Sequence, residues 1–90
     1  MLILFTEDEM VRQLNDNTKL FLKLIFNARK RNGFTQKKLA DILKKNQSYV
    51  SKYENGDRRL DVIEFLDVAH AINVNPVDII SDLENAWKKR

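Results

Sequence analysis

Hydrophobic residues recur along most of the chain at spacings of three and four, which is the period of an amphipathic α-helix. The clearest run precedes Gly33 and consists of Leu20, Phe21, Leu24, Ile25 and Ala28. Glycine suits the left-handed backbone that often ends a helix, so this helix is expected to stop before Gly33. An earlier run opens with Thr6 and Glu9, spaced as in a capping box. The pattern leaves open whether one long helix or two cover these runs.

Shorter periodic segments follow, and each begins at a residue suited to cap a helix. Thr35, Asn46 and Asp61 are suitable N-caps, and Asn75 is followed by Pro76, whose fixed backbone angle fits a first helical turn. The inward positions expected of these helices are Leu39, Ala40 and Leu43, then Val50 and Tyr53, then Val62, Phe65, Leu66, Ala69 and Ile72, and last Val77, Ile80, Leu83 and Trp87. The sequence therefore predicts an all-α protein.

Composition limits both the size of the fold and its chemistry. Ninety residues with 43% hydrophobic content suit one compact core. The absence of cysteine and the single histidine exclude a disulfide framework and a zinc site, and we expect neither metal nor cofactor. The apolar opening at residues 1–5 is too short to cross a membrane and leads into acidic residues, so a cytoplasmic location is expected. No catalytic motif is recognisable, and an enzyme is not expected.

Charge is unevenly distributed along the chain. Residues 28–59 carry a formal charge of +7, whereas the segments before and after carry −1 and −3. A basic middle between acidic ends is typical of a surface that faces a polyanion such as nucleic acid. A solvated lysine-rich helix face gives the same pattern, so charge alone does not separate these interpretations.

Residues 36–55 match the pattern of a helix-turn-helix unit, with two short helices, a tight turn and the small Ala40 where they approach. Here the chain resembles the lambda-repressor-like family, also called the Cro or Xre family, in residues 35–40 and 47–56. The resemblance covers about residues 20–80, and departs from the family at Lys44, where glycine is usual, and Leu60, where proline is frequent. It implies a five-helix lambda-repressor-like domain over 20–80. Outside the resemblance, the chain pattern predicts an N-terminal extension with a helical segment over 1–19, and the end of the last helix with a basic tail over 81–90.

The resemblance also implies which residues contact DNA. Gln47, Ser48 and Lys52 would read base edges in the major groove, with Tyr49 and Ser51 as less certain contacts, since a tyrosine here can equally pack or touch a phosphate. The expected phosphate contacts are Gln36, Lys37, Lys38, Lys45, Asn55, Arg58 and Arg59. In the family, the positions of Arg29 and Glu54 form a partly buried structural ion pair.

The leading functional hypothesis is a sequence-specific transcriptional regulator, a repressor that binds a two-fold operator as a homodimer. The dimer surface is expected either at the N-terminal segment with Leu2, Leu4 and Phe5 or at the last helix with Leu83 and Trp87, with some preference for the last helix. One alternative is an antitoxin that uses the same fold and also binds a toxin. Another is a protein-interaction module that reads no DNA sequence.

Overall fold

The computed structural model describes the backbone of residues 7–87 and the side chains of residues 16–87. Within 7–87 it contains five α-helices and no strand: α1 (Glu7–Arg31), α2 (Gln36–Leu43), α3 (Gln47–Glu54), α4 (Val62–Ala71) and α5 (Pro76–Ala86). The expected all-α, five-helix fold is confirmed. The two N-terminal runs form one continuous helix, α1, which crosses the domain boundary expected at residue 20. The capping residue expected there, Thr6, lies outside the described residues.

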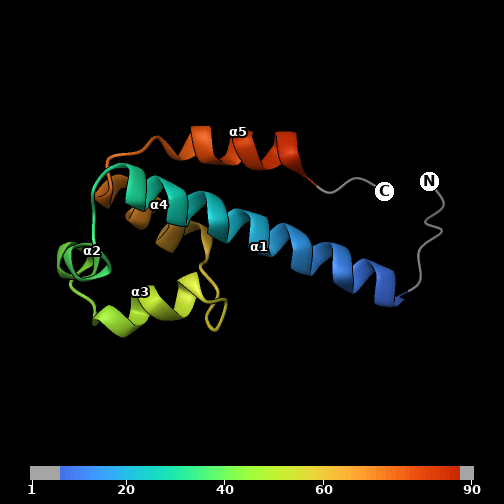
Figure 1. Ribbon diagram of the computed structural model, residues 1–90, viewed down its shortest axis with the longest axis horizontal. Helices are drawn as coiled ribbons and strands as arrows, with labels where there is room; N and C mark the ends of the chain where they lie inside the picture. The colour runs from blue at the N-terminus through green and yellow to red at the C-terminus, as the bar shows by residue number, and fades with distance from the viewer. Residues whose placement is uncertain (1–6, 88–90) are drawn as a thin grey trace.

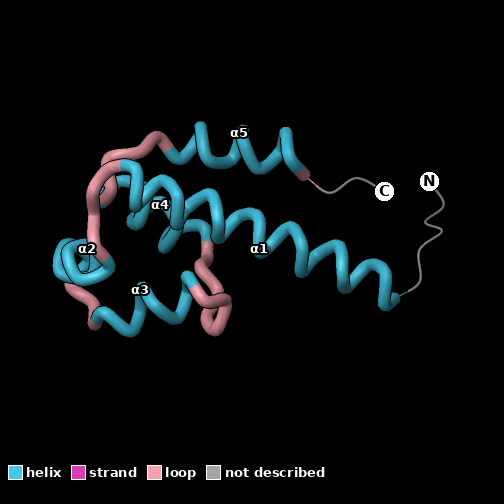
Figure 2. Tube along the Cα trace, viewed as in Figure 1, coloured by secondary structure: helices cyan, strands magenta, loops and turns pink. Residues whose placement is uncertain are grey.

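The helices enclose one core (Figure 1). α5 runs beside α1, whereas α2 and α3 pack against each other on the other side, and α4 joins the two groups by contacting α2 and α5. Each connection is a short loop, drawn pink in Figure 2. The arrangement leaves α3 at the surface, on the side of the molecule away from α5.

Side-chain caps fix where three of the helices begin. The Thr35 hydroxyl accepts from the Lys38 amide at 3.0 Å, and the Asn75 side chain accepts from the Val77 amide at 2.9 Å. Asp61 and Glu64 form a reciprocal capping box at the start of α4. Asn46 takes the N-cap position of α3 with extended backbone but makes no side-chain capping bond. The helix starts expected from the sequence are therefore confirmed.

Residues with a left-handed backbone conformation lie in the turns after α1, α2 and α3. Gly33 follows α1 with φ 79° and Gly56 follows α3 with φ 82°. Lys44 adopts φ 58° and ψ 43° in the turn between α2 and α3. This is the position at which the family usually has glycine, and a lysine there adopts a conformation that costs a side-chain-bearing residue about 1 kcal/mol. The turn keeps its left-handed geometry despite the substitution.

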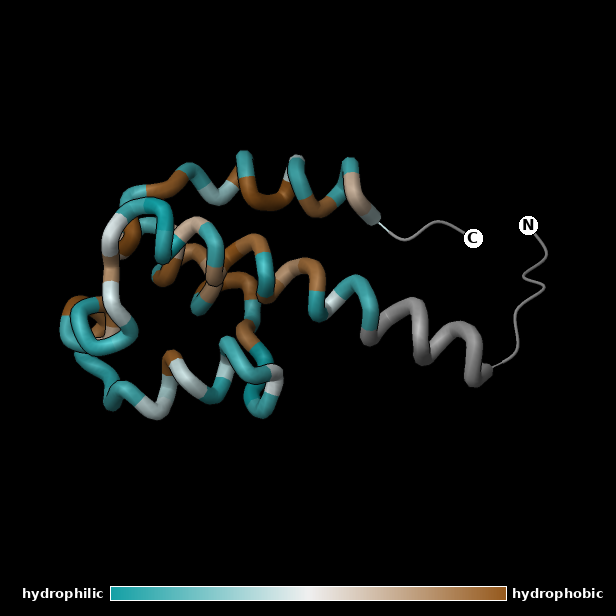
Figure 3. The backbone as a smooth tube through the Cα atoms, in the orientation of Figure 1, coloured by the Kyte–Doolittle hydropathy of each residue, from teal (hydrophilic) through white to brown (hydrophobic). Residues whose placement is uncertain are grey.

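The core is built from the inward faces of all five helices, seen as brown segments turned toward one another in Figure 3. Its fully buried members include Ile25, Leu39, Val50, Tyr53, Val68 and Ile72. Four expected core positions are wrong, because Val62, Val77, Ile80 and Trp87 are 71%, 68%, 47% and 38% exposed. Ile79 is buried in place of Val77, which lies about 200° away around the helix. Val62 is the first residue of α4 and lines an open groove at the surface instead of the core.

Tyr53 brings a hydroxyl group into this core that has no hydrogen-bond partner among the described residues. Burial raises the pKa of Tyr53, so the group stays protonated. An unsatisfied buried hydroxyl is destabilising, and Tyr53→Phe is therefore expected to raise the free energy of unfolding by about 1 kcal/mol in urea titrations. Tyr49→Phe, on the same helix but half-buried, is the control and should give no such gain. A free energy of unfolding lower than that of the wild type would contradict the interpretation that the Tyr53 hydroxyl is buried without a partner.

Candidate nucleic-acid interface

α2, the turn after it and α3 pack together and present one polar surface. Leu39 and Ala40 of α2 and Val50 and Tyr53 of α3 are buried, and the small Ala40 side chain permits close approach of the two helices. The opposite face of α3 is open to solvent. It presents Gln47, Ser48 and Lys52 as exposed residues, with Tyr49 and Ser51 partly buried beside them.

A hydrogen-bonded ion pair ties α3 to α1. Arg29 Nε lies 2.7 Å from Glu54 Oε2 and Arg29 Nη2 lies 3.0 Å from Glu54 Oε1, a bidentate arrangement. The two side chains are only 6% and 4% exposed. Arg29 Nη1 also donates to the carbonyl oxygen of Phe34 at 2.8 Å, in the turn that precedes α2. Both charges are therefore paired, and the pair connects α1, the turn before α2 and the end of α3.

The same carboxylate links the ion pair to the exposed face of α3. Gln36 Nε2, at the start of α2, donates to Glu54 Oε1 at 3.0 Å. Gln47 Nε2, at the start of α3, donates to Gln36 Oε1 at 3.4 Å. A chain of side chains therefore runs from the core pair to the residue expected to read a base. Within it Gln36 is half-buried and directs its amide group inward to Glu54.

The basic residues expected at phosphates lie on α2, in the turn after it and in the loop after α3. Those that are exposed are Lys37, Lys38, Lys45 and Arg59, together with the polar Asn55. Lys37 makes a loose ion pair with Asp41 at 3.4 Å, in which both side chains are well exposed, so its charge remains available. Arg58 differs because it is half-buried and its ion pair, with Glu64 at 2.6 Å, is much shorter.

Arg58 and Tyr49 form a cluster with Glu64 at the edge of α3. Arg58 Nη2 lies 2.6 Å from Glu64 Oε2, and the guanidinium carbon lies 4.6 Å from the centre of the Tyr49 ring. The hydrogen bond from Arg58, with one from the Asp61 amide, lowers the pKa of Glu64 to about 2. The stabilisation that this ionised carboxylate gives the fold is therefore present above its ordinary pKa of 4.5 and lost only as the pH falls toward 2.

Comparison with known families shows which family of proteins carries a surface of this kind. Residues 25–79, more than half of the chain, match the model of a helix-turn-helix family. The chain belongs to this family of DNA-binding transcriptional regulators. The match starts within α1 and ends within α5, so the first half of α1 and the end of α5 lie outside it.

Solved structures place this helix-turn-helix protein in the Xre group. An XRE-family like protein from Pseudomonas syringae pv. tomato str. DC3000 is 40% identical, with a TM-score of 0.86 over 91% of this chain and all of that one. The restriction-modification controller protein C.AhdI from Aeromonas hydrophila is 28% identical, with a TM-score of 0.63 over 72% of this chain and 97% of that one. None of the curated proteins matches this chain. The Cro/Xre resemblance noted in the sequence is confirmed.

Glu64 is the member of the helix-turn-helix surface that sequence reasoning missed. Asp61 was recognised as a helix cap, but its spacing from Glu64 also matches a capping box, the signal that could have drawn attention to the second carboxylate. No sequence pattern indicates the pairing of Glu64 with Arg58, because this contact depends on the path of the loop between α3 and α4. The inward bond from Gln36 to Glu54 was likewise not anticipated.

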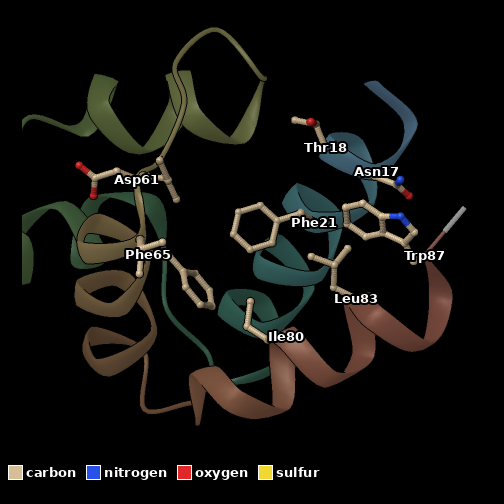
Figure 4. A pocket seen from close by; sticks show the side chains of 10 residues that line it. Asn17, Thr18, Phe21, Asp61, Phe65, Ile80, Leu83 and Trp87 are labelled. Atoms are coloured by element: carbon tan, nitrogen blue, oxygen red, sulfur yellow. The ribbon is translucent and has the colours of Figure 1, made fainter. Parts of the chain in front are cut away.

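A second feature of this helix-turn-helix protein is an apolar groove between α1, α4 and α5 (Figure 4). Its volume is about 310 Å³. Phe21, Phe65, Ile80, Leu83 and Trp87 line it, and the figure shows their side chains turned toward the same space. Ile80 and Trp87 remain 47% and 38% exposed, so the groove opens to solvent.

Other kinds of site find no support in the described part of the chain. Among those residues there is no group of three or more histidine, cysteine or acidic side chains placed to hold a metal ion. No helix described here is long and apolar enough to cross a membrane.

Proposed function

We propose that this chain is a cytoplasmic repressor that binds a two-fold operator as a homodimer, with α3 lying in the major groove of each half-site. The observation that carries the proposal is the polar face of α3, which is exposed at Gln47, Ser48 and Lys52 while Val50 and Tyr53 fix the helix from behind. An α-helix fits the major groove of B-DNA, where each base pair presents a distinct pattern of donors and acceptors.

Each exposed side chain of α3 suits a particular base contact. Gln47 has both a donor and an acceptor and pairs well with adenine, whereas Lys52 suits the acceptors of guanine. Gln36 supports Gln47 through their 3.4 Å hydrogen bond, so the reading amide is oriented before DNA arrives. Ser48 suits several bases, and Tyr49 and Ser51 take secondary positions at the edge.

The surrounding cations supply affinity without sequence preference. Lys37, Lys38, Lys45 and Arg59 are exposed around α3, and residues 28–59 carry a net charge of +7. Gln36 and Asn55 stand at the start of α2 and the end of α3, and Arg58 follows in the next loop. We assign these groups to the sugar-phosphate backbone, which sets the register of the protein on DNA.

The apolar groove supports a dimer formed through α5. A domain of this size covers few base pairs, and a second copy related by a two-fold axis doubles the site that is read. The groove exposes Ile80 and Trp87, and α5 lies on the side of the fold away from α3, so a partner seated there leaves the reading face open (Figure 1). We therefore place the second copy against α5 and the adjoining part of α1.

Two matched substitutions test the division of the DNA surface into base-reading and phosphate-contacting residues. Gln47→Ala removes the proposed adenine contact, so the preference for the operator over other duplexes should fall by roughly 10- to 100-fold, the range expected for one bidentate contact. Lys38→Ala should keep the preference and weaken binding to all duplexes alike. Site selection from random duplexes followed by titration of each variant measures both quantities.

Salt dependence and site preference separate a DNA reader from a protein-interaction module in the same experiment, whereas binding of a second protein identifies an antitoxin. A DNA reader loses about 0.9 log units of affinity per log unit of salt for each phosphate contact, and keeps its preferred site. A protein-interaction module selects no sequence. An antitoxin selects a sequence and in addition binds a second protein. If Gln47→Ala and Lys38→Ala changed affinity and preference identically, the assignment of readers and backbone contacts would be wrong.

A further inference from the structure

The loop after α3 holds a cation that is already engaged inside the protein. Arg58 donates through Nη2 to Glu64 at 2.6 Å and through Nη1 to the carbonyl oxygen of Arg59 at 2.9 Å. Its guanidinium group lies over the ring of Tyr49, the third residue of α3. We propose that Glu64 is a positioning residue for sequence reading, which holds Arg58 against Tyr49 and thereby fixes the exposed edge of α3. The inference rests on the proposed DNA-reading function.

Glu64 is itself held rigidly, so that it can determine where Arg58 lies. Its Oε1 accepts from the Asp61 amide at 3.0 Å, and its own amide donates to Asp61 Oδ1 at 2.7 Å. Its other oxygen, Oε2, is the one bound to Arg58. One carboxylate thus joins the first turn of α4 to the loop that follows α3. Movement of Arg58 away from Tyr49 would break a short, charge-assisted hydrogen bond.

Tyr49 depends on this arrangement because its ring is bounded by cations and by one aromatic neighbour. The Arg58 guanidinium carbon lies 4.6 Å and the Lys45 Nζ lies 5.4 Å from the ring centre. The Tyr53 ring meets it edge to face, with the centroids 6.0 Å apart. Cation–π attraction favours a fixed ring, and a fixed ring presents a defined shape to a neighbouring base pair. Without Glu64 the cation closest to the ring loses its anchor.

The pairing with Glu64 leaves Arg58 able to contact DNA as well. A guanidinium group has five N–H donors in a fixed plane, and the contacts to Glu64 and Arg59 occupy only part of them. The remaining donors can meet a phosphate while the plane stays over Tyr49. Glu64 also places a negative charge near the phosphates, which opposes binding to any duplex. Its removal is therefore expected to affect sequence preference and general affinity in opposite directions.

Glu64→Gln is the decisive variant because glutamine still accepts the capping-box hydrogen bond while losing the charge. Its control is Asp67→Asn, which removes one negative charge from an exposed position of the same helix. Binding is measured to the selected operator and to a random duplex, at several salt concentrations. For Glu64→Gln we expect tighter binding to the random duplex and a roughly tenfold lower preference for the operator, comparable to one mismatched base pair. Asp67→Asn should leave the preference unchanged.

Arg58→Lys provides the second variant. Lysine keeps the charge but lacks the plane that stacks on Tyr49 and binds the carboxylate, so this variant should also lose operator preference. If Glu64→Gln proves unstable in thermal unfolding, the operator preference of Arg58→Lys tests the inference on its own. Equal preference ratios for Glu64→Gln and Asp67→Asn, or full preference in Arg58→Lys, would overturn the inference. Failure of the wild-type protein to prefer any duplex would instead overturn the proposed function.

Discussion

Arg29→Ala is expected to lower the free energy of unfolding by about 3–5 kcal/mol, the cost of leaving one partner of a buried ion pair without the other. Glu54 would then keep a charge that is almost excluded from water, and the Phe34 carbonyl would lose its donor. Small domains are stable by about 5–15 kcal/mol, so this loss is a large fraction of the total. Urea unfolding followed by circular dichroism gives the value directly.

Lys30→Ala is the matched control for this prediction. It removes a cation from the next residue of α1, where the side chain is exposed and makes no ion pair within the described residues. Its effect on stability should stay within about 0.5 kcal/mol, as for most surface substitutions. A variant lacking Arg29 that is as stable as the Lys30 variant would show that the pair contributes nothing to the fold.

Ile80→Glu is expected to weaken binding to a two-fold operator by about 100-fold or more, because linked half-sites gain that much from simultaneous engagement. A carboxylate at this position would lie in the apolar groove and oppose the contact with the second copy. Binding to an isolated half-site should remain unchanged, since α5 lies on the side of the fold away from α3 (Figure 1). Analytical ultracentrifugation should report half the mass of the wild-type particle.

Val77→Glu tests whether the effect belongs to the groove. Val77 is also on α5 and is more exposed than Ile80, but it is not part of the groove lining. It should therefore keep the mass and the operator affinity of the wild type. Loss of dimerisation in Val77→Glu with retention in Ile80→Glu would place the second copy on another face of α5.

Local signals explain why the helices and their order could be predicted from sequence. Asp61 and the Asn75–Pro76 pair act through bonds to residues two or three positions away, so their effect is independent of the rest of the fold. The inward positions of α5 are predicted less well than its start, because Val77, Ile80 and Trp87 are all exposed. The apolar pattern places Val77 in the core, whereas the packing of α5 against α1 buries Ile79.

The polar contacts could be predicted only in part, since they join segments far apart in the chain. The family resemblance implied the pairing of Arg29 with Glu54, which are separated by 25 residues. Nothing in the spacing showed that Gln36 would bind the same carboxylate, or that Arg58 would bind Glu64. Such contacts follow from the directions of side chains after the helices have packed, which a linear pattern does not contain.

The bond from Gln36 to Glu54 separates the residues that we propose to face DNA into two groups, those that also support the fold and those that do not. A change at Gln36 alters both the support of Gln47 and a partner of the core carboxylate, so it affects recognition and folding together. Ser48 and Lys52 are exposed and make no side-chain bond to any other described residue. New operator preferences in descendants of this protein are therefore expected to arise first at these two positions, where the fold imposes the least selection.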